Sequence, residues 1–358
     1  MGEQAHALLE RLVGSLIGSA EMMNVYLGDR LGLYGPLADT WLTSTELASQ
    51  AGIAERYARE WLEEQAVAGF IEVDDQTASA ADRRYALPAE HAQVLLDRDA
   101  PTYLAAYARM LVAAAQQLPA LMDAYRNGGG VGWAEYGPDM SEGQEFGNRP
   151  TFINALAEWF SSIPDVDERL SAGGRMADVG SGGGWTSISL AKAYPALTVD
   201  GFDLDVPAVM RAQANAEEAG VGDRVRFHAM SPADAEHDGG YDLVTAFECI
   251  HDMPQPVPVL RAMREMAAGV GTVIVMDEKR AAGVRRAGRR DRTPDVRVQH
   301  VDLPAGRDVA RRIGRDGNRH AAFGVRGIRA RSWVHRRRDP ADRRRLLAVL
   351  PADRLTGA

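Results

Sequence analysis

Apolar residues recur at helical spacing through the first third of the chain and then give way to a short alternating stretch. Residues 6–27 carry leucines and an isoleucine three and four positions apart, which predicts an opening helix that packs against other parts of the protein. Residues 43–52 begin with a capping signature, and residues 54–68 form a second amphipathic stretch. Residues 69–73 and 84–87 flank a polar turn like a small hairpin. This order predicts a winged helix-turn-helix domain within residues 1–98.

A helical and glycine-rich region follows. Residues 100–126 predict one long helix, and residues 151–162 predict another. Between them lies a run of glycines at 128–130 with aromatic residues after it, Trp133 and Tyr136 among them. This segment is either an interdomain linker or a loop that closes over a bound ligand. We therefore assign residues 99–165 to a helical linker and lid.

Short apolar runs alternate with helical stretches from residue 166 onward. The runs at 175–180, 197–202, 224–229, 241–247 and 272–276 predict strands. Strands that alternate with helices are typical of a parallel sheet covered on both faces. The predicted fold class is therefore α/β, with a Rossmann-like domain over residues 166–280 behind a mostly α winged-helix domain.

The composition limits where the protein works. With 358 residues and 46% apolar content, the chain is long enough for two ordinary globular domains. Cys249 is its single cysteine, which excludes a disulfide framework and a metal site built from several cysteines. The chain shows no signal peptide and no apolar stretch long enough to span a membrane. We expect a cytoplasmic protein without membrane contact.

The charge of the predicted helix-turn-helix bears on DNA binding. A helix that reads DNA needs cations to neutralise phosphates. Residues 54–68 carry two arginines against four glutamates, so their net charge is −2. DNA is therefore an unlikely partner, and we expect the domain to serve in dimerisation and in covering the substrate.

A glycine-rich loop follows the first predicted strand of the α/β domain. Asp178, Gly180, Gly182 and Gly184 occupy alternate positions, and a helix begins after them. Glycine is required because the backbone must turn sharply and lie against a ligand, while the helix N-terminus offers unpaired N–H groups. A dinucleotide site would have the pattern G-x-G-x-x-G/A, but Trp185 stands three residues after Gly182. The spacing disfavours NAD.

Two further segments place polar residues at predicted strand ends. Asp203 ends the second strand, 25 positions after Asp178, where a carboxylate can accept hydrogen bonds from both ribose hydroxyls of a nucleotide. Alternatively, Asp203 only caps the helix that begins near Val206. The fourth strand opens onto residues 248–253, with the sequence Glu-Cys-Ile-His-Asp-Met. Ligands of open α/β sheets bind beyond the carboxyl ends of the strands, so this segment should face the reacting atoms.

These motifs together resemble class I S-adenosylmethionine-dependent methyltransferases with an N-terminal winged-helix domain. The pattern D-x-G-x-G-x-G at 178–184 is similar to their cofactor loop, and residues 248–253 are similar to the His-Asp segment of small-molecule O-methyltransferases. The resemblance implies S-adenosyl-L-methionine as cofactor, a small-molecule acceptor methylated at oxygen, and a homodimer. The cofactor-binding residues that we predict are Asp178, Gly180, Ser181, Gly182, Gly184, Asp203, Leu204, Ser231, Asp234 and Glu248.

The resemblance also implies roles for individual side chains. His251 would act as the general base that takes the acceptor's proton, since an unperturbed imidazole titrates near neutrality, with Asp252 or Glu248 orienting it. The alternative is a histidine that only packs against the cofactor. Relatives place an aspartate directly after the third strand to hold the adenine amino group. Ser231 stands at that position here and Asp234 follows three residues later, which puts the adenine contact in doubt.

Two other functions compete with this one. A transcriptional regulator could combine a winged helix with a domain that senses S-adenosylmethionine, and its DNA binding would weaken steeply with salt. An NAD-dependent oxidoreductase would share the Rossmann-like fold. The acidic helix disfavours the first, and the residues at 178 and 185 disfavour the second.

Residues 281–358 differ from the rest of the chain. Residues 1–280 have a net charge of −22, whereas the remainder carries +13, with 21 arginines, no lysine and no glutamate. A basic disordered tail is one interpretation. We favour an out-of-frame translation that begins near residues 279–281, because a shift of one base lets residues 291–306 read T-E-R-L-M-Y-G-F-S-M-L-I-C-L-P-A, like the C-terminus of this family. The sixth and seventh strands of the sheet would then be missing, and activity would be impaired.

Overall fold

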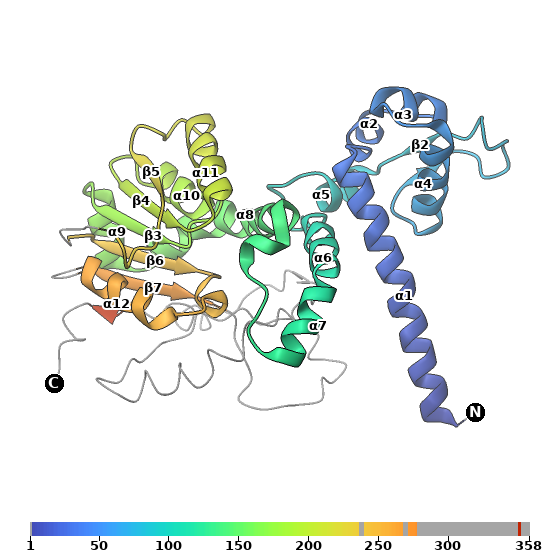
Figure 1. Ribbon diagram of the computed structural model, residues 1–358. Helices are drawn as coiled ribbons and strands as arrows, with labels where there is room; N and C mark the ends of the chain where they lie inside the picture. Colours follow the sequence, from blue (N-terminus) through green and yellow to red (C-terminus); the bar gives the residue numbers. More distant parts are fainter. Residues whose placement is uncertain (1, 236–239, 268–270, 278–349, 352–358) are drawn as a thin grey trace. The chain divides into compact units, whose positions relative to one another are not determined.

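The computed structural model describes residues 2–235, 240–267, 271–277 and 350–351 (Figure 1). The chain forms two compact units. Unit 1 consists of Met1–Gln116 and Pro138–Pro150, and unit 2 consists of Gln117–Gly137 and Thr151–Ala358. None of the described helices combines the length and apolarity needed to cross a bilayer.

Unit 1 contains the predicted winged helix. Its elements are α1 (Glu3–Arg30), α2 (Tyr34–Asp39), α3 (Ser44–Ala51), α4 (Glu55–Val67), β1 (Glu72–Val73), β2 (Tyr85–Ala86), α5 (Ala89–Leu95) and α6 (Ala106–Gln116). Thr43 and Glu46 form a reciprocal capping box at the start of α3, and Gly52 ends that helix in the left-handed conformation. Leu47 and Leu62 of the two helices are fully buried in one core with Tyr85 of the hairpin. The helix-turn-helix and its short wing are therefore as the sequence predicted.

Helix α1 differs from the prediction in one respect. We expected its apolar residues to pack against other parts of the chain, but Leu12 and Leu16 are 56% and 71% exposed. Only its last third is covered, where Val25 joins a small core with Tyr103 and Ala106. The apolar periodicity is present, but within the described residues it has no packing partner along the first four turns.

The region between the two predicted domains is more helical than expected. The single helix predicted at 100–126 is two helices, α6 and α7 (Leu118–Asn127), because Pro119 lies in the first turn of α7. The glycine-rich segment leads to a short 3-10 helix, η1 (Trp133–Tyr136), and then to α8 (Gly137–Ser161). Helix α8 begins 14 residues earlier than the helix predicted at 151–162 and contains Pro150 in its interior.

Close packing explains why α8 forms despite its glycines and its proline. A Cβ on Gly143 would come within 2.6 Å of Met110 Cγ, and one on Gly147 within 3.3 Å of the Tyr107 ring. The glycines therefore let α8 lie directly on α6 inside unit 1. Tertiary packing here outweighs local helix propensity.

Unit 2 contains the predicted Rossmann-like sheet. The strands β3 (Arg175–Val179), β4 (Thr198–Asp203), β5 (Val225–Ala229), β6 (Leu243–Phe247) and β7 (Thr272–Met276) are parallel and lie in the order β5-β4-β3-β6-β7. Besides α7 and the second half of α8, this unit contains the helices α9 (Pro164–Ser171), α10 (Trp185–Ala193), α11 (Val206–Glu218) and α12 (Pro256–Met266). The predicted α/β fold class is confirmed.

The helices of unit 2 cover both faces of its sheet. Helices α9, α10 and α11 supply Leu170, Ile188 and Ala216 to the core on one face. Helix α12 supplies Met263 and Met266 to the core on the other face (Figure 1). Side chains along β3 alternate accordingly: Met176 belongs to the first core, and Ala177 and Val179 belong to the second.

A sixth, two-residue strand borders β7. Strand β8 (Leu350–Pro351) pairs antiparallel with Val273 and Thr272 of β7. The sequence predicted no strand in residues 281–358, so this short pairing differs from the prediction. The remainder of that segment, and with it the predicted disorder, lies outside the described residues.

Candidate functional site

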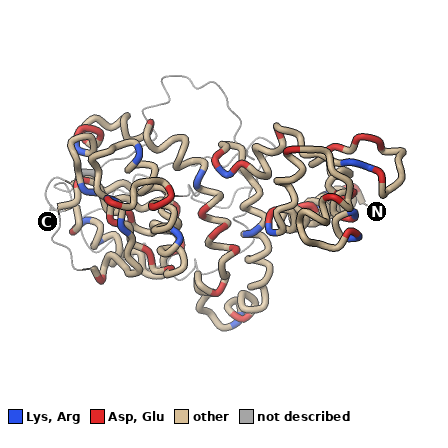
Figure 2. The backbone as a smooth tube through the Cα atoms, turned by 90° about the horizontal axis from the view of Figure 1, so that it is seen from above, with Lys and Arg blue, Asp and Glu red and all other residues tan. Residues whose placement is uncertain are grey.

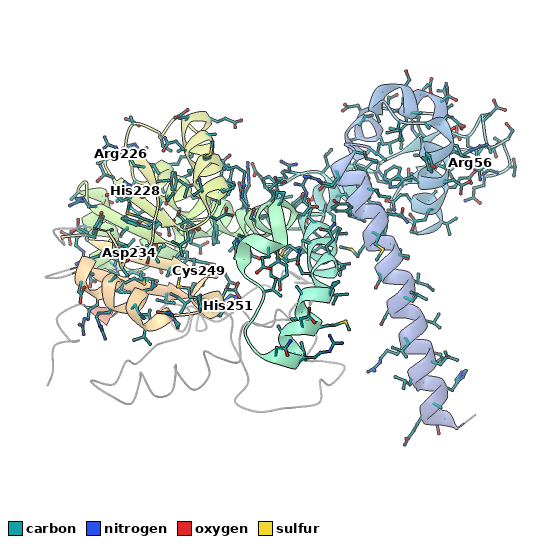
Figure 3. The ribbon with its side chains drawn as sticks, in the orientation of Figure 1. Arg56, Arg226, His228, Asp234, Cys249 and His251 are labelled. Atoms are coloured by element: carbon teal, nitrogen blue, oxygen red, sulfur yellow. The ribbon has the colours of Figure 1, made fainter. Side chains whose placement is uncertain are left out.

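The candidate site lies at the carboxyl ends of the parallel strands. The strand order reverses between β3 and β6, and in open α/β sheets ligands bind where this happens. The loops after β3, β6 and β7 all emerge there. Figure 3 shows Cys249 and His251 near each other at this edge of unit 2.

The loop after β3 is shaped by three left-handed glycines. Gly180, Gly182 and Gly184 have φ values of 69°, 51° and 81°. A Cβ on Gly180 would lie 2.7 Å from Cys249 Sγ, and one on Gly184 would lie 2.5 Å from Phe227 Cζ. Side chains at these two positions would therefore collide with the protein itself, in addition to straining the backbone.

Gly182 differs from its two neighbours. A Cβ on Gly182 would meet no atom of the described residues within 4 Å, so among these residues the space above the tip of the loop is open. Ser181 beside it is buried, and its hydroxyl is among the buried polar atoms of the described residues that make no hydrogen bond. Open space next to a buried, unsatisfied hydroxyl is the kind of cradle that a bound molecule fills.

Asp178 lies beneath the loop and is 2% exposed. Its carboxylate accepts hydrogen bonds from Ser187 Oγ at 2.7 Å and from Thr245 Oγ1 at 2.9 Å. Burial raises the pKa of Asp178 to about 6, although the two hydroxyls act in the opposite direction. This side chain joins β3, α10 and β6 rather than facing solvent.

Asp203 ends β4 next to the glycine loop. Its carboxylate accepts the Gly182 N–H at 2.8 Å and the Asp205 N–H at 2.9 Å. The side chain is partly exposed, yet burial still raises its pKa. The second bond comes from Asp205, which is itself the N-cap residue of α11, and α11 has no side-chain cap, so this bond is not the helix cap that the sequence left open as an alternative. The first bond fixes the carboxylate at the loop, where it can also meet a ligand.

The predicted adenine side is more open. Leu204 is 73% exposed beside Asp203. Ser231 and Asp234 lie in the turn after β5, where the Asp234 N–H bonds to the Ser231 carbonyl at 3.0 Å and the Asp234 side chain is exposed. Strand β5 pairs with β4 so that Ala229 lies opposite Asp203, which brings this turn to the same edge.

The segment after β6 combines strain with burial. Glu248 is 7% exposed and has a φ of 54°, and it is the one non-glycine residue of the described chain with positive φ. Backbone strain of this kind collects at functional sites. Its neighbour Cys249 donates from Sγ to the Val179 carbonyl at 3.3 Å. Burial, followed by the charges of four aspartates, raises the pKa of the Cys249 thiol; the four are Asp277, Asp178, Asp203 and Asp252.

His251 is held by a residue to which the sequence assigned no role. Asp277, which follows β7, binds His251 twice: one oxygen accepts the backbone N–H at 3.0 Å, and the other makes a short hydrogen bond with Nδ1. Asp252 Oδ2 lies 3.4 Å from Nε2. The sequence did contain a signal, because the carboxyl ends of neighbouring parallel strands meet at one edge of the sheet.

Two family descriptions match the chain. Residues 19–97 match the Rv2258c-like winged HTH domain, and residues 176–303 match the methyltransferase domain. The second match spans the glycine loop, Asp203 and His251 on the sheet described above. The chain therefore contains a winged HTH domain followed by a methyltransferase domain.

Known proteins resemble the methyltransferase domain in sequence and the whole chain in fold. The ubiquinone biosynthesis O-methyltransferase of Ralstonia nicotianae is 36% identical over 122 residues, which are 34% of this chain and 48% of that protein. The chain thus spans about half the length of this curated relative. Mitomycin 7-O-methyltransferase MmcR has a TM-score of 0.56 at 22% identity, covering 80% of this chain and 84% of that one.

A further structural neighbour was solved with ligands. The O-methyltransferase NcsB1 from neocarzinostatin biosynthesis, in complex with S-adenosylmethionine and 2-hydroxy-5-methyl naphthoic acid, has a TM-score of 0.51 at 20% identity. The similarity covers 72% of this chain and 80% of that one. At such identity the likeness establishes the fold of the methyltransferase domain.

Proposed function

We propose that the protein transfers the methyl group of S-adenosylmethionine to a small-molecule acceptor, at an oxygen atom. The observation that carries the proposal is the cradle formed by the loop after β3, in which Gly182 donates to Asp203 and leaves open space above itself. The methyltransferase domain match and the NcsB1 complex with this cofactor favour the same ligand.

Different residues around the loop would contact different parts of the cofactor. The backbone of residues 180–184 would hold the amino-acid part, and Asp203 would accept hydrogen bonds from the ribose. Leu204 would offer an apolar surface to the adenine, while Ser231 and Asp234 lie at the edge that its amino group would reach. Asp178 is too deeply buried to touch a ligand and would act by holding the loop in place.

His251 would remove the acceptor's proton. When bound, the cofactor supplies an electrophilic methyl group on a sulfonium. Asp277 accepts at Nδ1 of His251, which favours the tautomer that carries its proton there and leaves Nε2 free of a proton. Nε2 can then take the proton of a hydroxyl acceptor, and the Asp252 carboxylate 3.4 Å away would stabilise the imidazolium that forms.

Calorimetric titration of the full chain with S-adenosylhomocysteine tests the cofactor site. We expect saturable binding that Asp203→Ala weakens by about thirtyfold, because a charge-assisted hydrogen bond to the ribose is lost. NAD should give no heat. The absence of heat with the methyl donor and with its product would remove the basis of the proposal.

Methyl transfer from labelled cofactor to a panel of phenols tests the base. His251→Gln should lower kcat by about a hundredfold and leave cofactor binding unchanged. Asp277→Asn should shift the pH dependence of kcat, since Asp277 acts through the imidazole. Unchanged turnover in His251→Gln would favour the alternative in which His251 only packs against the cofactor.

We assign the winged helix to dimerisation rather than to DNA reading. On α4, Arg56 pairs with Glu60 at 2.5 Å and Arg59 with Glu55 at 3.5 Å, so both arginines of that helix are engaged by carboxylates. A regulator would need them for phosphates. Salt-sensitive binding to duplex DNA would instead favour the regulator.

The exposed apolar stripe of α1 fits a homodimer. Leu12 and Leu16 lie on a long helix whose first four turns contact no other described part of the chain, and a second copy can bury them. Leu16→Glu should halve the mass measured by light scattering, and Ser15→Glu on the same exposed turn should not. We also place the protein in the cytoplasm, in keeping with its single reduced cysteine.

The out-of-frame origin of residues 281–358 remains our proposal for that segment. The methyltransferase match continues past the proposed slip at residues 279–281 and ends at residue 303, so the later residues 304–358 are the part without a match. A sheet that lacks its last strands would be less stable and poorly active. Sequencing the gene across codons 275–295 decides the point, because an uninterrupted frame with the expected intact mass would contradict it.

A further inference from the structure

One peptide group of the glycine loop has no hydrogen-bond partner among the described residues. The group that joins Ser181 to Gly182 is bonded at both ends: its carbonyl accepts the Gly184 N–H at 2.8 Å, and its N–H donates to Asp203 at 2.8 Å. The following group joins Gly182 to Gly183. Neither its carbonyl nor its N–H bonds to a described residue, although Gly183 is buried. Buried backbone groups rarely stay without a partner, so we expect a ligand at this peptide group.

The peptide group after it is held by a residue of α11. Asn215 Nδ2 donates to the Gly183 carbonyl at 2.9 Å. The N–H at the other end of this group belongs to Gly184 and donates to the Ser181 carbonyl. The group between Gly182 and Gly183 therefore lies between two groups that the protein fixes, one through Asp203 and the other through Asn215.

Small residues bring α11 close to the loop. The buried positions of this helix are Ala208, Ala212 and Ala216. A Cβ on Gly184 would lie 3.1 Å from the Ala212 Cβ, so helix and loop are in close contact. At this separation the short side chain of Asn215, which follows Ala212 by three positions, reaches the loop carbonyl. No local pattern marks Asn215, because it is one of several polar residues along α11.

We propose that Asn215 is a positioning residue for the cofactor, which holds the loop so that the peptide group between Gly182 and Gly183 meets the amino-acid part of the ligand. The inference rests on the proposed function and deepens it. A peptide group offers one N–H donor and one carbonyl acceptor, and the carboxylate and the ammonium of an amino acid can use both. A Cβ on Gly182 would meet no described atom within 4 Å, so a ligand has room at this peptide group.

Calorimetry on the full chain with two ligands tests the inference. S-adenosylhomocysteine carries the nucleoside and the amino-acid part, whereas 5′-methylthioadenosine carries the nucleoside and the thioether without the amino acid. Asn215→Ala should weaken the binding of S-adenosylhomocysteine by about tenfold and change that of 5′-methylthioadenosine by less than about twofold. Asp203→Ala should weaken the binding of both, because both ligands carry the ribose.

Gln213→Ala is the matched control. It removes a side-chain amide from the same helix, where Gln213 makes an exposed hydrogen bond to Glu217 at 3.4 Å, and it should leave both affinities unchanged. Asn215→Asp keeps the shape of the side chain but replaces the N–H donor by an oxygen, so it should show the same selective loss. This variant decides the point if the alanine variant does not fold.

The outcomes separate the inference from the proposed function. Equal losses for the two ligands would mean that Asn215 only supports the fold of the loop, and unchanged affinities would mean that the loop does not need Asn215. Either result overturns the inference and leaves the proposed function standing. If S-adenosylhomocysteine does not bind to the unaltered chain, the proposed function fails and the inference fails with it.

Discussion

The two units treat their buried charges in opposite ways. In unit 1, Arg109 is 4% exposed and lies between the carboxylates of Asp29 and Glu142, with the Phe146 ring 5.5 Å from its guanidinium carbon. In unit 2, Asp178 is 2% exposed, and its side-chain partners among the described residues are the hydroxyls of Ser187 and Thr245. Acidic residues outnumber basic ones along the described chain (Figure 2), yet unit 1 still neutralises its most buried charge.

The difference separates structural charges from functional ones. Arg109 joins α1, α6 and α8 into one body, since Asp29 and Glu142 come from the two other helices. Nothing about this arrangement leaves a field for a ligand. Asp178 sits beneath an open cradle, and burial of its carboxyl without a cation beside it raises its pKa. A buried charge that the protein does not neutralise marks the place where we expect a ligand.

The largest expected effect comes from breaking the neutralised cluster. Arg109→Met leaves Asp29 and Glu142 facing each other without their shared cation, and such losses cost about 3–5 kcal/mol. We expect the unfolding of unit 1 to shift down by about 10 °C in scanning calorimetry. Arg56→Gln serves as control, because the pair of Arg56 with Glu60 also lies in unit 1, is exposed, and its loss should cost less than about 0.5 kcal/mol. Equal shifts in both variants would contradict the structural role of Arg109.

Removal of the charge of Asp178 is expected to change stability by a smaller amount and in the opposite direction. Folding raises the pKa of Asp178 from 3.8 to about 6. At pH values above about 6, where the carboxyl is ionised in both states, the charged Asp178 therefore destabilises the folded state. Asp178→Asn should therefore stabilise unit 2 at pH 7.5, by up to about 3 kcal/mol. The two hydroxyls can reorient around the amide, because Thr245 Oγ1 also lies 3.4 Å from the Ala177 carbonyl.

The pH dependence gives this prediction a second readout. As pH falls from 7 through 6 toward 3.8, folded Asp178 takes up a proton before the unfolded chain does, so the penalty disappears. The stability difference between Asp178→Asn and the unaltered protein should therefore narrow from pH 7.5 to pH 5 in urea unfolding. A difference that stays constant over this range would show that the charge of Asp178 is not its cause.

The smallest effect concerns the outer part of the neutralised cluster. Tyr26 donates to Asp139 at 2.7 Å, and that carboxylate also lies 3.4 Å from Arg30. Because the arginine remains, Tyr26→Phe should cost only about 1 kcal/mol. Thermal unfolding of unit 1 should drop by a few degrees, well short of the shift in Arg109→Met. A shift as large as that of Arg109→Met would mean that Tyr26, and not the arginine, holds α8 to α1.

Much of the fold was predictable because local signals were strong. Strand β7 has the predicted bounds, and the ends of β3 to β6 lie within two residues of the predicted ones. Alternating strands and helices with a glycine loop admit few other folds. The first half of α8 was not predictable, since Pro150 and the glycines before it argue against a helix and only the packing of Gly143 on Met110 explains it.

The sequence by itself determined which residue types reach the site, because the glycine spacing at 180–184, the acid at 203 and the histidine at 251 are fixed by their positions relative to strand ends. Only the tertiary structure decided which of these side chains contact one another. Asp277 rather than Asp252 or Glu248 holds Nδ1 of His251, and Asp178 turned inward to Ser187 and Thr245. These pairings join residues 9 to 67 positions apart, and such contacts depend on sheet register and burial, which no local pattern encodes.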